Sequence, residues 1–204
     1  MSVISVDTDG IYVSTKPNLN KINEYLDRLT EETFGCENYL HMDIEEYDAA
    51  FFRETKGKHY ILKRGDKLIF HGASFKGSRV PKFWDQILEE VARKMFNGER
   101  ISAKDINLTQ FDLADLTQSI RVQSKSSYKN KNSLPMQLIR QFEEEVGSEL
   151  VEDDQLQYIK TKNGYELYIP GKEVHGIDWK YYKRIIQDIF DRLNIQDGRQ
   201  MTLC

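Results

Sequence analysis

The chain has 204 residues, of which 39% are hydrophobic and 30% are charged, and its formal net charge is -4 at pH 7. This length allows a sizeable core, in one domain or two small ones, and the composition is that of a soluble globular protein. No apolar run approaches the roughly 20 residues that span a membrane, and no secretory signal begins the chain. Two cysteines are too few for a disulfide framework. We therefore expect a cytoplasmic protein with no membrane partner.

The first fourteen residues predict a β-hairpin with two carboxylates at its tip. Strand-forming residues 3–6 and 11–13 flank Asp7-Thr8-Asp9-Gly10, and Asp-Gly is a strong hairpin signal. Residues i and i+2 of an extended chain point to the same side, so Asp7 and Asp9 can converge on one point.

Two carboxylates held close together repel each other unless a cation or a proton lies between them. Mg²⁺ prefers hard oxygen ligands and typically takes one or two protein carboxylates together with water and substrate phosphates. Asp7 and Asp9 are therefore the candidate metal-binding and catalytic residues. The alternative is a solvated turn in which Asp and Gly supply only the turn geometry, and this short motif alone leaves both interpretations open.

The stretch Val-Ile-Ser-Val-Asp-Thr-Asp-Gly-Ile-Tyr-Val resembles the third polymerase motif of family B DNA polymerases, usually Tyr-Gly-Asp-Thr-Asp-Ser in a palm hairpin. The resemblance implies that Asp9 binds two catalytic Mg²⁺ ions together with an Asp from an earlier motif. It implies that Asp7 lies beside the site and supports it. The sequence departs from the motif at Ser5, Val6 and Gly10.

Residues 17–72 predict one helix and several strands. Pro17 opens the helix, Gly35 ends it, and its apolar stripe is expected to be core. Residues 39–47 alternate between apolar and polar, which predicts a half-buried strand. Strands are also expected at 49–53, 58–63 and 68–71. Residues 1–72 are therefore expected to form a largely antiparallel sheet with one helix against it.

Two further elements in this part resemble family B polymerases. A Lys-Lys-x-Tyr element stands here as Gly57-Lys58-His59-Tyr60, and the resemblance implies that Lys58 and Tyr60 contact the primer strand. A Lys-Gly element followed by Arg stands as Lys76-Gly77-Ser78-Arg79 before a long helix. It implies DNA contacts for Lys76 and Arg79, although the spacing to the helix is about a residue shorter than in the commonest form.

The second half predicts a mostly helical domain with a small hairpin. Helices are expected at 81–97, within 108–120, at 135–146 and at 179–193, the last capped by Asp178. A hairpin across Asn163-Gly164 is expected to join strands 155–161 and 165–169. The polar region 99–107 is expected to be a linker.

The loop 121–133 has the composition of a phosphate-contacting segment, with hydroxyls, a tyrosine and several cations. Tyr128-Lys129 before Leu134-Pro135 and a helix resembles the thumb of family B polymerases, where a Tyr-Lys touches the duplex backbone. The candidate DNA-binding residues of this loop are Arg121, Lys125, Tyr128, Lys129 and Lys131.

Cations and acids are segregated along the chain. Residues 53–82 hold nine Lys or Arg against two acids, residues 117–142 hold five and no acid, and the acids gather in 24–48 and 143–154. Such segregation is typical of a basic surface on an acidic protein, and we prefer a phosphate-facing surface to a merely solvated one.

The last residues resemble the first half of the clamp-binding peptide that ends many polymerases. Gln200 and Leu203 occupy its first two anchor positions, and the aromatic pair that would follow is absent from the sequence. A sliding clamp is therefore an expected partner only for a chain that carries those aromatic residues.

The motifs, taken in order, resemble the C-terminal part of a family B DNA polymerase, with an α+β fold: a palm at 1–75, an antiparallel sheet with a helix, and a mostly helical thumb at 76–204. The first two polymerase motifs are absent. We therefore expect either the small subunit of a split polymerase, as some archaea have, or an excised fragment, inactive alone and completed by a large subunit on primer-template DNA. The alternative is a non-catalytic polymerase-like DNA-binding or scaffold subunit.

Overall fold

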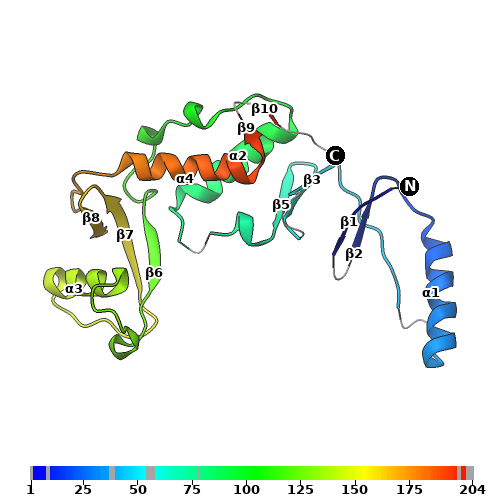
Figure 1. Ribbon diagram of the computed structural model, residues 1–204, viewed down its shortest axis with the longest axis horizontal. Helices are drawn as coiled ribbons and strands as arrows, with labels where there is room; N and C mark the ends of the chain where they lie inside the picture. Colours follow the sequence, from blue (N-terminus) through cyan, green and yellow to red (C-terminus); the bar gives the residue numbers. More distant parts are fainter. Residues whose placement is uncertain are drawn as a thin grey trace. The chain divides into compact units, whose positions relative to one another are not determined.

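The computed structural model describes residues 2–7, 10–36, 40–53, 58–77, 79–196 and 199–200. The chain divides into two compact units, which for the described residues are the part up to Gly72 and the part from Ala73 to Gln200. Both mix helices with antiparallel sheets, so the expected α+β class is confirmed (Figure 1). The interpretation of the units as a palm at 1–75 and a thumb at 76–204 stays a prediction. None of the described helices combines the length and the apolar composition that crossing a membrane requires.

The first unit begins with the predicted hairpin. Strands β1 (Val3–Asp7) and β2 (Gly10–Val13) pair antiparallel, and Ser14 donates its backbone N–H to the carbonyl of Ser2 at 3.0 Å. Val6 lies opposite Ile11, whereas Val3 lies opposite Val13, so strand β1 carries one extra residue between them. This β-bulge keeps Val3 and Val6 on the same face although they are three residues apart.

Helix α1 (Leu19–Phe34) forms as predicted, but its apolar stripe is not core. The side chain of Asn18 caps it by accepting from the N–H of Lys21 at 3.2 Å, and Gly35 ends it in the left-handed conformation. Thr30 is the single fully buried residue of this helix, and Leu29 and Phe34 are 42% and 66% exposed. Leu19, Ile22 and Leu26 are only partly buried, so the stripe is covered in part and does not form a core.

Strands β3 (Ala49–Phe52), β4 (Tyr60–Arg64) and β5 (Lys67–His71) form a separate antiparallel sheet in the order β3-β4-β5. The single sheet expected for residues 1–72 is therefore two sheets. The strand predicted at 39–47 is also wrong, since the described residues 40–47 are extended but unpaired with any strand. The side-chain amide of Asn23 holds them instead, accepting from the N–H of Met42 at 2.9 Å and donating to its carbonyl at 3.1 Å.

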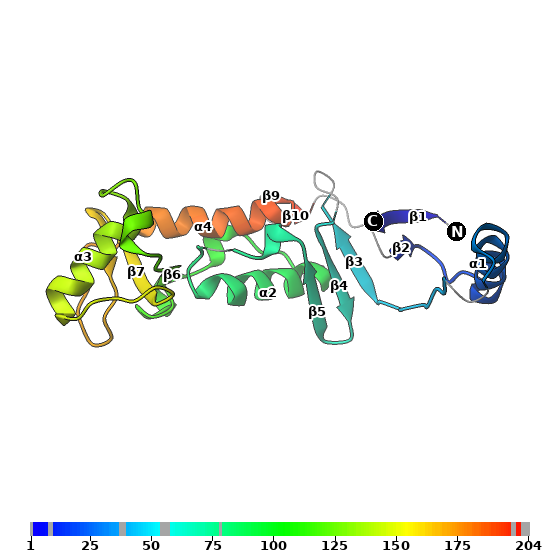
Figure 2. The same cartoon turned by 90° about the horizontal axis from the view of Figure 1, so that it is seen from below.

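The second unit contains two helices that pack together and a small sheet with its own helix. Helices α2 (Phe83–Phe96) and α4 (Trp179–Arg192) bury their apolar sides, and the Arg192 guanidinium lies 4.9 Å from the centre of the Trp84 ring. Asp178 caps α4 as predicted by accepting from the N–H of Tyr181 at 3.0 Å. Figure 2 shows α2 and α4 side by side along their lengths.

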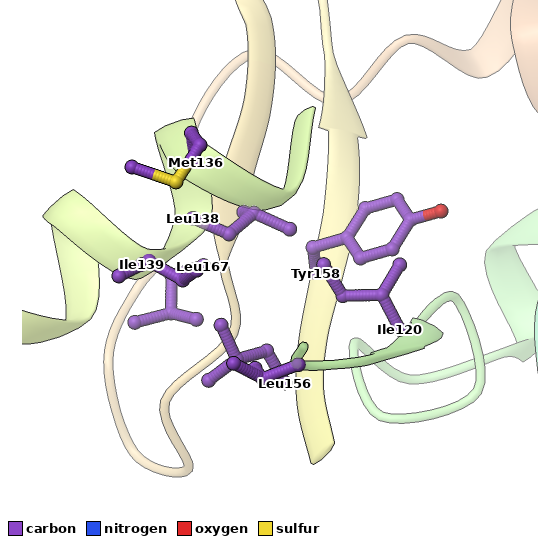
Figure 3. Packing of buried hydrophobic residues seen from close by; sticks show 8 residues of the cluster. Ile120, Met136, Leu138, Ile139, Leu156, Tyr158 and Leu167 are labelled. Carbon is purple, nitrogen blue, oxygen red and sulfur yellow. The ribbon is translucent and has the colours of Figure 1, made fainter. Parts of the chain in front are cut away.

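The small sheet has three strands, β6 (Gln118–Arg121), β7 (Gln155–Thr161) and β8 (Gly164–Leu167), all antiparallel with β7 in the centre. Helix α3 (Leu134–Val146) covers one face, and residues of the helix and all three strands meet in a buried cluster (Figure 3). Its members are Ile120, Val122, Met136, Leu138, Ile139, Leu156, Tyr158 and Leu167.

The predicted helix within 108–120 is therefore wrong beyond one short turn, since strand β6 occupies its end. A 3₁₀ turn, Leu108–Gln110, is all that forms there. Other 3₁₀ turns are Ala73–Phe75, Ala103–Asp105 and Lys125–Ser127, and a short strand pair joins β9 (Ile195–Gln196) to β10 (Arg199–Gln200).

Candidate functional site

The hairpin tip holds the residues that would bind metal. Asp7 is the last residue of β1 and lies opposite Gly10, the first residue of β2. Asp9 lies outside the described residues, and so does Thr8. The backbone pairing confirms the predicted hairpin for the described residues Val3–Asp7 and Gly10–Val13.

Tyr12 anchors the hairpin from the face opposite Val6 and Ile11. Its ring lies 5.3 Å from the Phe52 ring and 5.1 Å from the Tyr60 ring, and its hydroxyl donates to the Tyr60 hydroxyl at 2.8 Å. Tyr60 in turn stacks on His71, with 4.5 Å between ring centres. This aromatic cluster fixes the hairpin against the β3–β5 sheet, because edge and stacked ring pairs are attractive as well as apolar.

The two carboxylates of the hairpin are the type of ligand that Mg²⁺ prefers, but they are too few to complete a metal site by themselves. Two carboxylates are hard oxygen ligands, which Mg²⁺ accepts. No group of three or more His, Cys, Asp or Glu that could hold a metal occurs among the described residues. A two-metal site therefore stays a prediction for Asp7 and Asp9, and any further protein ligands would come from outside the described part of this chain.

The structure places the two members of the Lys58 and Tyr60 element very differently. Lys58 is exposed, and its backbone has a φ of 66°, in the left-handed region. Tyr60 is only 5% exposed and belongs to the aromatic cluster. A DNA contact stays a prediction for both residues, but the position of Tyr60 already has a structural explanation.

Three exposed cations, Lys76, Arg79 and Lys82, lie in the segment that leads into α2. Gly77 is sterically required there, since a Cβ at this position would lie 2.3 Å from Cγ1 of Val80. Lys82 Nζ donates to Gln157 Oε1 of β7 at 3.3 Å. The segment is thus held near the small sheet, a proximity that sequence motifs do not reveal.

The electrostatics of Tyr158 place Arg79 near the same sheet. Burial raises the pKa of the Tyr158 hydroxyl to about 12, Tyr181 adds to the rise, and the Arg79 guanidinium opposes it. Lys76, Arg79 and Lys82 form no ion pair with another described residue, so their charges are available to a ligand. We call these three residues the entry cations.

The loop 121–133 has fewer available cations than its sequence suggests. Arg121 forms an ion pair with Asp153 at 2.8 Å, and Lys125 forms one with Glu143, whose hydrogen bond raises the pKa of Lys125. The acids of 143–154 therefore neutralise part of the acid-free run. Separation along the chain does not reveal these pairs.

Tyr128 stabilises this loop by a hydrogen bond and by packing, and its side chain does not extend freely into solvent. Its hydroxyl accepts from the N–H of Gln123 at 2.8 Å, and its partly buried ring packs on the cluster in Figure 3. Lys131 Nζ lies 3.5 Å from the Lys125 carbonyl, and the carbonyl of Lys131 accepts from Arg140 at 2.7 Å. Lys129 is exposed and has no ion pair with a described residue.

The candidate clamp-binding residues are barely described. The backbone of Gln200 lies in β10, opposite Ile195. Leu203 lies outside the described residues. The clamp-binding expectation stays a prediction.

Comparison with known proteins supports the fold. No protein-family model matches the chain, and no curated protein sequence matches it either. Its structure is similar to that of the family B DNA polymerase from the hyperthermophilic archaeon Pyrobaculum calidifontis, with a TM-score of 0.60 and 14% sequence identity. The similarity covers 97% of this chain and 27% of that polymerase, so the chain spans about a quarter of its length. The fold is therefore polymerase-like over nearly the whole chain.

Proposed function

We propose that this chain is the C-terminal palm-and-thumb part of a DNA-directed DNA polymerase. The observation that carries the proposal is the polymerase-like fold over 97% of the chain, in which Asp7 ends the first strand of the hairpin and Asp9 follows two residues later in the sequence. The sequence motifs and the fold similarity are separate lines of support. Residues up to about 75 would be the palm and the remainder the thumb.

Asp7 and Asp9 would contribute one wall of a site for two Mg²⁺ ions. Asp9 would bind metal directly, and Asp7 would support it from the last position of β1. When bound, a metal pair of this kind activates the primer 3′-hydroxyl and stabilises the leaving pyrophosphate. The remaining ligands and the nucleotide site would come from a large subunit carrying the other two polymerase motifs.

The second unit would hold primer-template DNA without reading its sequence. The entry cations and Lys129 have no ion pair with a described residue, and lysine contacts with phosphates position a duplex without specifying bases. Arg121 and Lys125 would have to exchange Asp153 and Glu143 for phosphates, which lowers their net contribution. DNA affinity should therefore depend on a subset of the cations in the two basic runs.

Primer extension by the reconstituted enzyme tests the proposal. The chain alone should incorporate no nucleotide, and addition of a chain with the other two motifs should restore Mg²⁺-dependent extension. Asp9→Ala should abolish extension and Asp7→Ala should lower it less, with duplex binding nearly unchanged in both. Glu152→Ala, which removes an exposed acid of the second unit, is the matched control and should extend normally.

A scaffold that binds DNA without catalysing is the second candidate. It is favoured by the departures at Ser5, Val6 and Gly10, since Val6 is a large apolar residue, 63% exposed, where the motif has glycine. An assembled complex that extends primers at the same rate with wild type and with Asp9→Ala would support the scaffold and exclude a catalytic role for this chain.

A further inference from the structure

The outer face of the β1–β2 hairpin is an apolar surface with no described cover. The β-bulge places Val3, Val6, Ile11 and Val13 on one face, while Tyr12 occupies the other. Val3, Val6 and Ile11 are 59%, 63% and 51% exposed, and Val13 is partly exposed. Single exposed apolar side chains are ordinary, but four on one face of one hairpin mark an interaction site.

A two-stranded sheet is marginally stable by itself and gains stability from a layer packed on it. Tyr12 gives one face of the hairpin such a layer through Phe52 and Tyr60. Within the first unit, α1 lies beside the hairpin and not across it in both views (Figures 1 and 2). Helix α1 also leaves apolar side chains exposed, among them Tyr25 at 57% and Phe34 at 66%.

The charge of the segment that follows the hairpin indicates what kind of partner covers this surface, although Glu45 and Glu46 of this segment are paired with Arg64 and Lys16. Residues 24–48, which follow the hairpin, hold nine acids and one Arg. On α1, the exposed Glu24, Glu31 and Glu32 form no ion pair with a described residue. Nucleic acid and anionic membranes would be repelled, whereas a protein with an apolar patch bordered by Lys and Arg would be attracted.

We infer that the outer face of the β1–β2 hairpin is the docking surface for the large subunit, which would cover Val3, Val6, Ile11 and Val13 with an apolar patch bordered by basic residues. This inference rests on the proposed function. It is supported by the extent of the fold similarity. This chain matches only 27% of the similar polymerase, in which the remaining residues belong to the same polypeptide as the matched part. The hairpin would thus serve catalysis at its tip and assembly on its face.

Site-specific photocrosslinking in the source cells tests the inference on the full chain. A photoreactive amino acid at Val6 should capture a protein chain that carries the other two polymerase motifs. The same amino acid at Val151, an equally apolar residue of the second unit that is 66% exposed, should not capture it. Capture of a second copy of this chain at Val6, or equal capture at both positions, would overturn the inference.

Titration of the captured chain, produced in pure form, against the purified full protein completes the test. Val6→Glu and Ile11→Glu should each weaken binding by at least about tenfold, as charge does in the centre of an apolar contact, and Val151→Glu should not. Because these side chains are exposed, the variants should fold, which circular dichroism checks. Equal affinity for wild type and both hairpin variants would overturn the docking surface.

The two proposals fail in different ways. A captured chain without polymerase motifs that loses affinity for Val6→Glu would keep the docking surface as a protein-binding face and overturn the polymerase assignment. A polymerase-like chain that binds wild type and Val6→Glu equally would keep the polymerase assignment and overturn the docking surface.

Discussion

Lys125 and Lys129 look alike in the sequence, but they differ in whether an acid neutralises their charge. Lys125 is in an ion pair with Glu143, whereas Lys129, four residues away, has no ion pair with a described residue. A duplex phosphate that binds Lys125 must displace a carboxylate, and one that binds Lys129 displaces only counterions and water.

We therefore predict unequal effects on duplex binding, measured by fluorescence anisotropy across a range of salt concentrations. Lys129→Ala should reduce the slope of log affinity against log salt by about 0.9, the value for one phosphate contact, and Lys125→Ala should reduce it less. Glu143→Gln should strengthen binding because it releases Lys125. Identical slopes for the two lysine variants would contradict this view of the loop.

Buried tyrosines of the second unit should make its stability fall at high pH. Burial raises the pKa of Tyr158 to about 12 and also raises that of Tyr182, so both hydroxyls stay protonated in the fold at a pH where the unfolded chain ionises. Their contribution is complete below about pH 10 and is lost as the pH rises through the folded pKa.

The free energy of unfolding should therefore fall by about 1.4 kcal/mol per pH unit for each such tyrosine above pH 10. Tyr158→Phe removes one ionisable group and should make this dependence shallower. Urea unfolding at a series of pH values, followed by far-ultraviolet circular dichroism, measures it. The exposed Tyr25→Phe is the control and should leave the slope unchanged.

At the scale of elements, one asparagine replaces a whole strand pairing. Asn23 of α1 makes both backbone hydrogen bonds to Met42, as a neighbouring strand would, and holds the extended residues 40–47. We predict that Asn23→Ala speeds hydrogen exchange at the Met42 amide by about fivefold, since a hydrogen bond contributes about 1 kcal/mol. Asn20→Ala on the same helix removes no such bond, so an equal effect there would refute the assignment.

The apolar pattern of the sequence predicted the long helices and strands, and it failed for segments whose structure depends on tertiary contacts. Helices α2, α3 and α4 and strands β7 and β8 lie close to their expected bounds because their apolar patterns are long. Strand β6 alternates over only four residues, with Gln118 and Ile120 buried, which is too short a pattern to separate from a helix end. The extended residues 40–47 alternate like a strand, yet an amide side chain satisfies Met42.

The sequence predicted the residue types of the candidate site, but it did not predict which of their charges are neutralised by other residues. The hairpin bearing Asp7 follows from Asp-Gly between strand formers, a local signal. Two ion pairs join residues that are far apart in sequence, Lys125 with Glu143 and Arg121 with Asp153. The hydrogen bond from Lys82 to Gln157 does the same. Burial of Tyr60 likewise depends on Tyr12, 48 residues away.

At the scale of the whole molecule, two compact units imply two cores that can be weakened separately. Ile61 of the first unit and Ile139 of the second are both 0% exposed. Each Ile→Ala change should cost about 2–5 kcal/mol, the usual range for a buried isoleucine. Calorimetry should show two transitions, with Ile61→Ala lowering one and Ile139→Ala the other. Equal shifts of a single transition by both variants would contradict independent cores.

The extra residue in β1 has a consequence for how this hairpin tolerates change in length. The extra residue interrupts the alternation of side chains between the two faces of the hairpin, so that residues before it and after it are out of step by one position. Deleting Ile4 would restore a regular ladder in which Val3 and Val6, then two positions apart, still share one face. Deletion of Ile4 should therefore be tolerated far better than deletion of Val6, which would move Ser5 to the position opposite Ile11 and turn it to the apolar face.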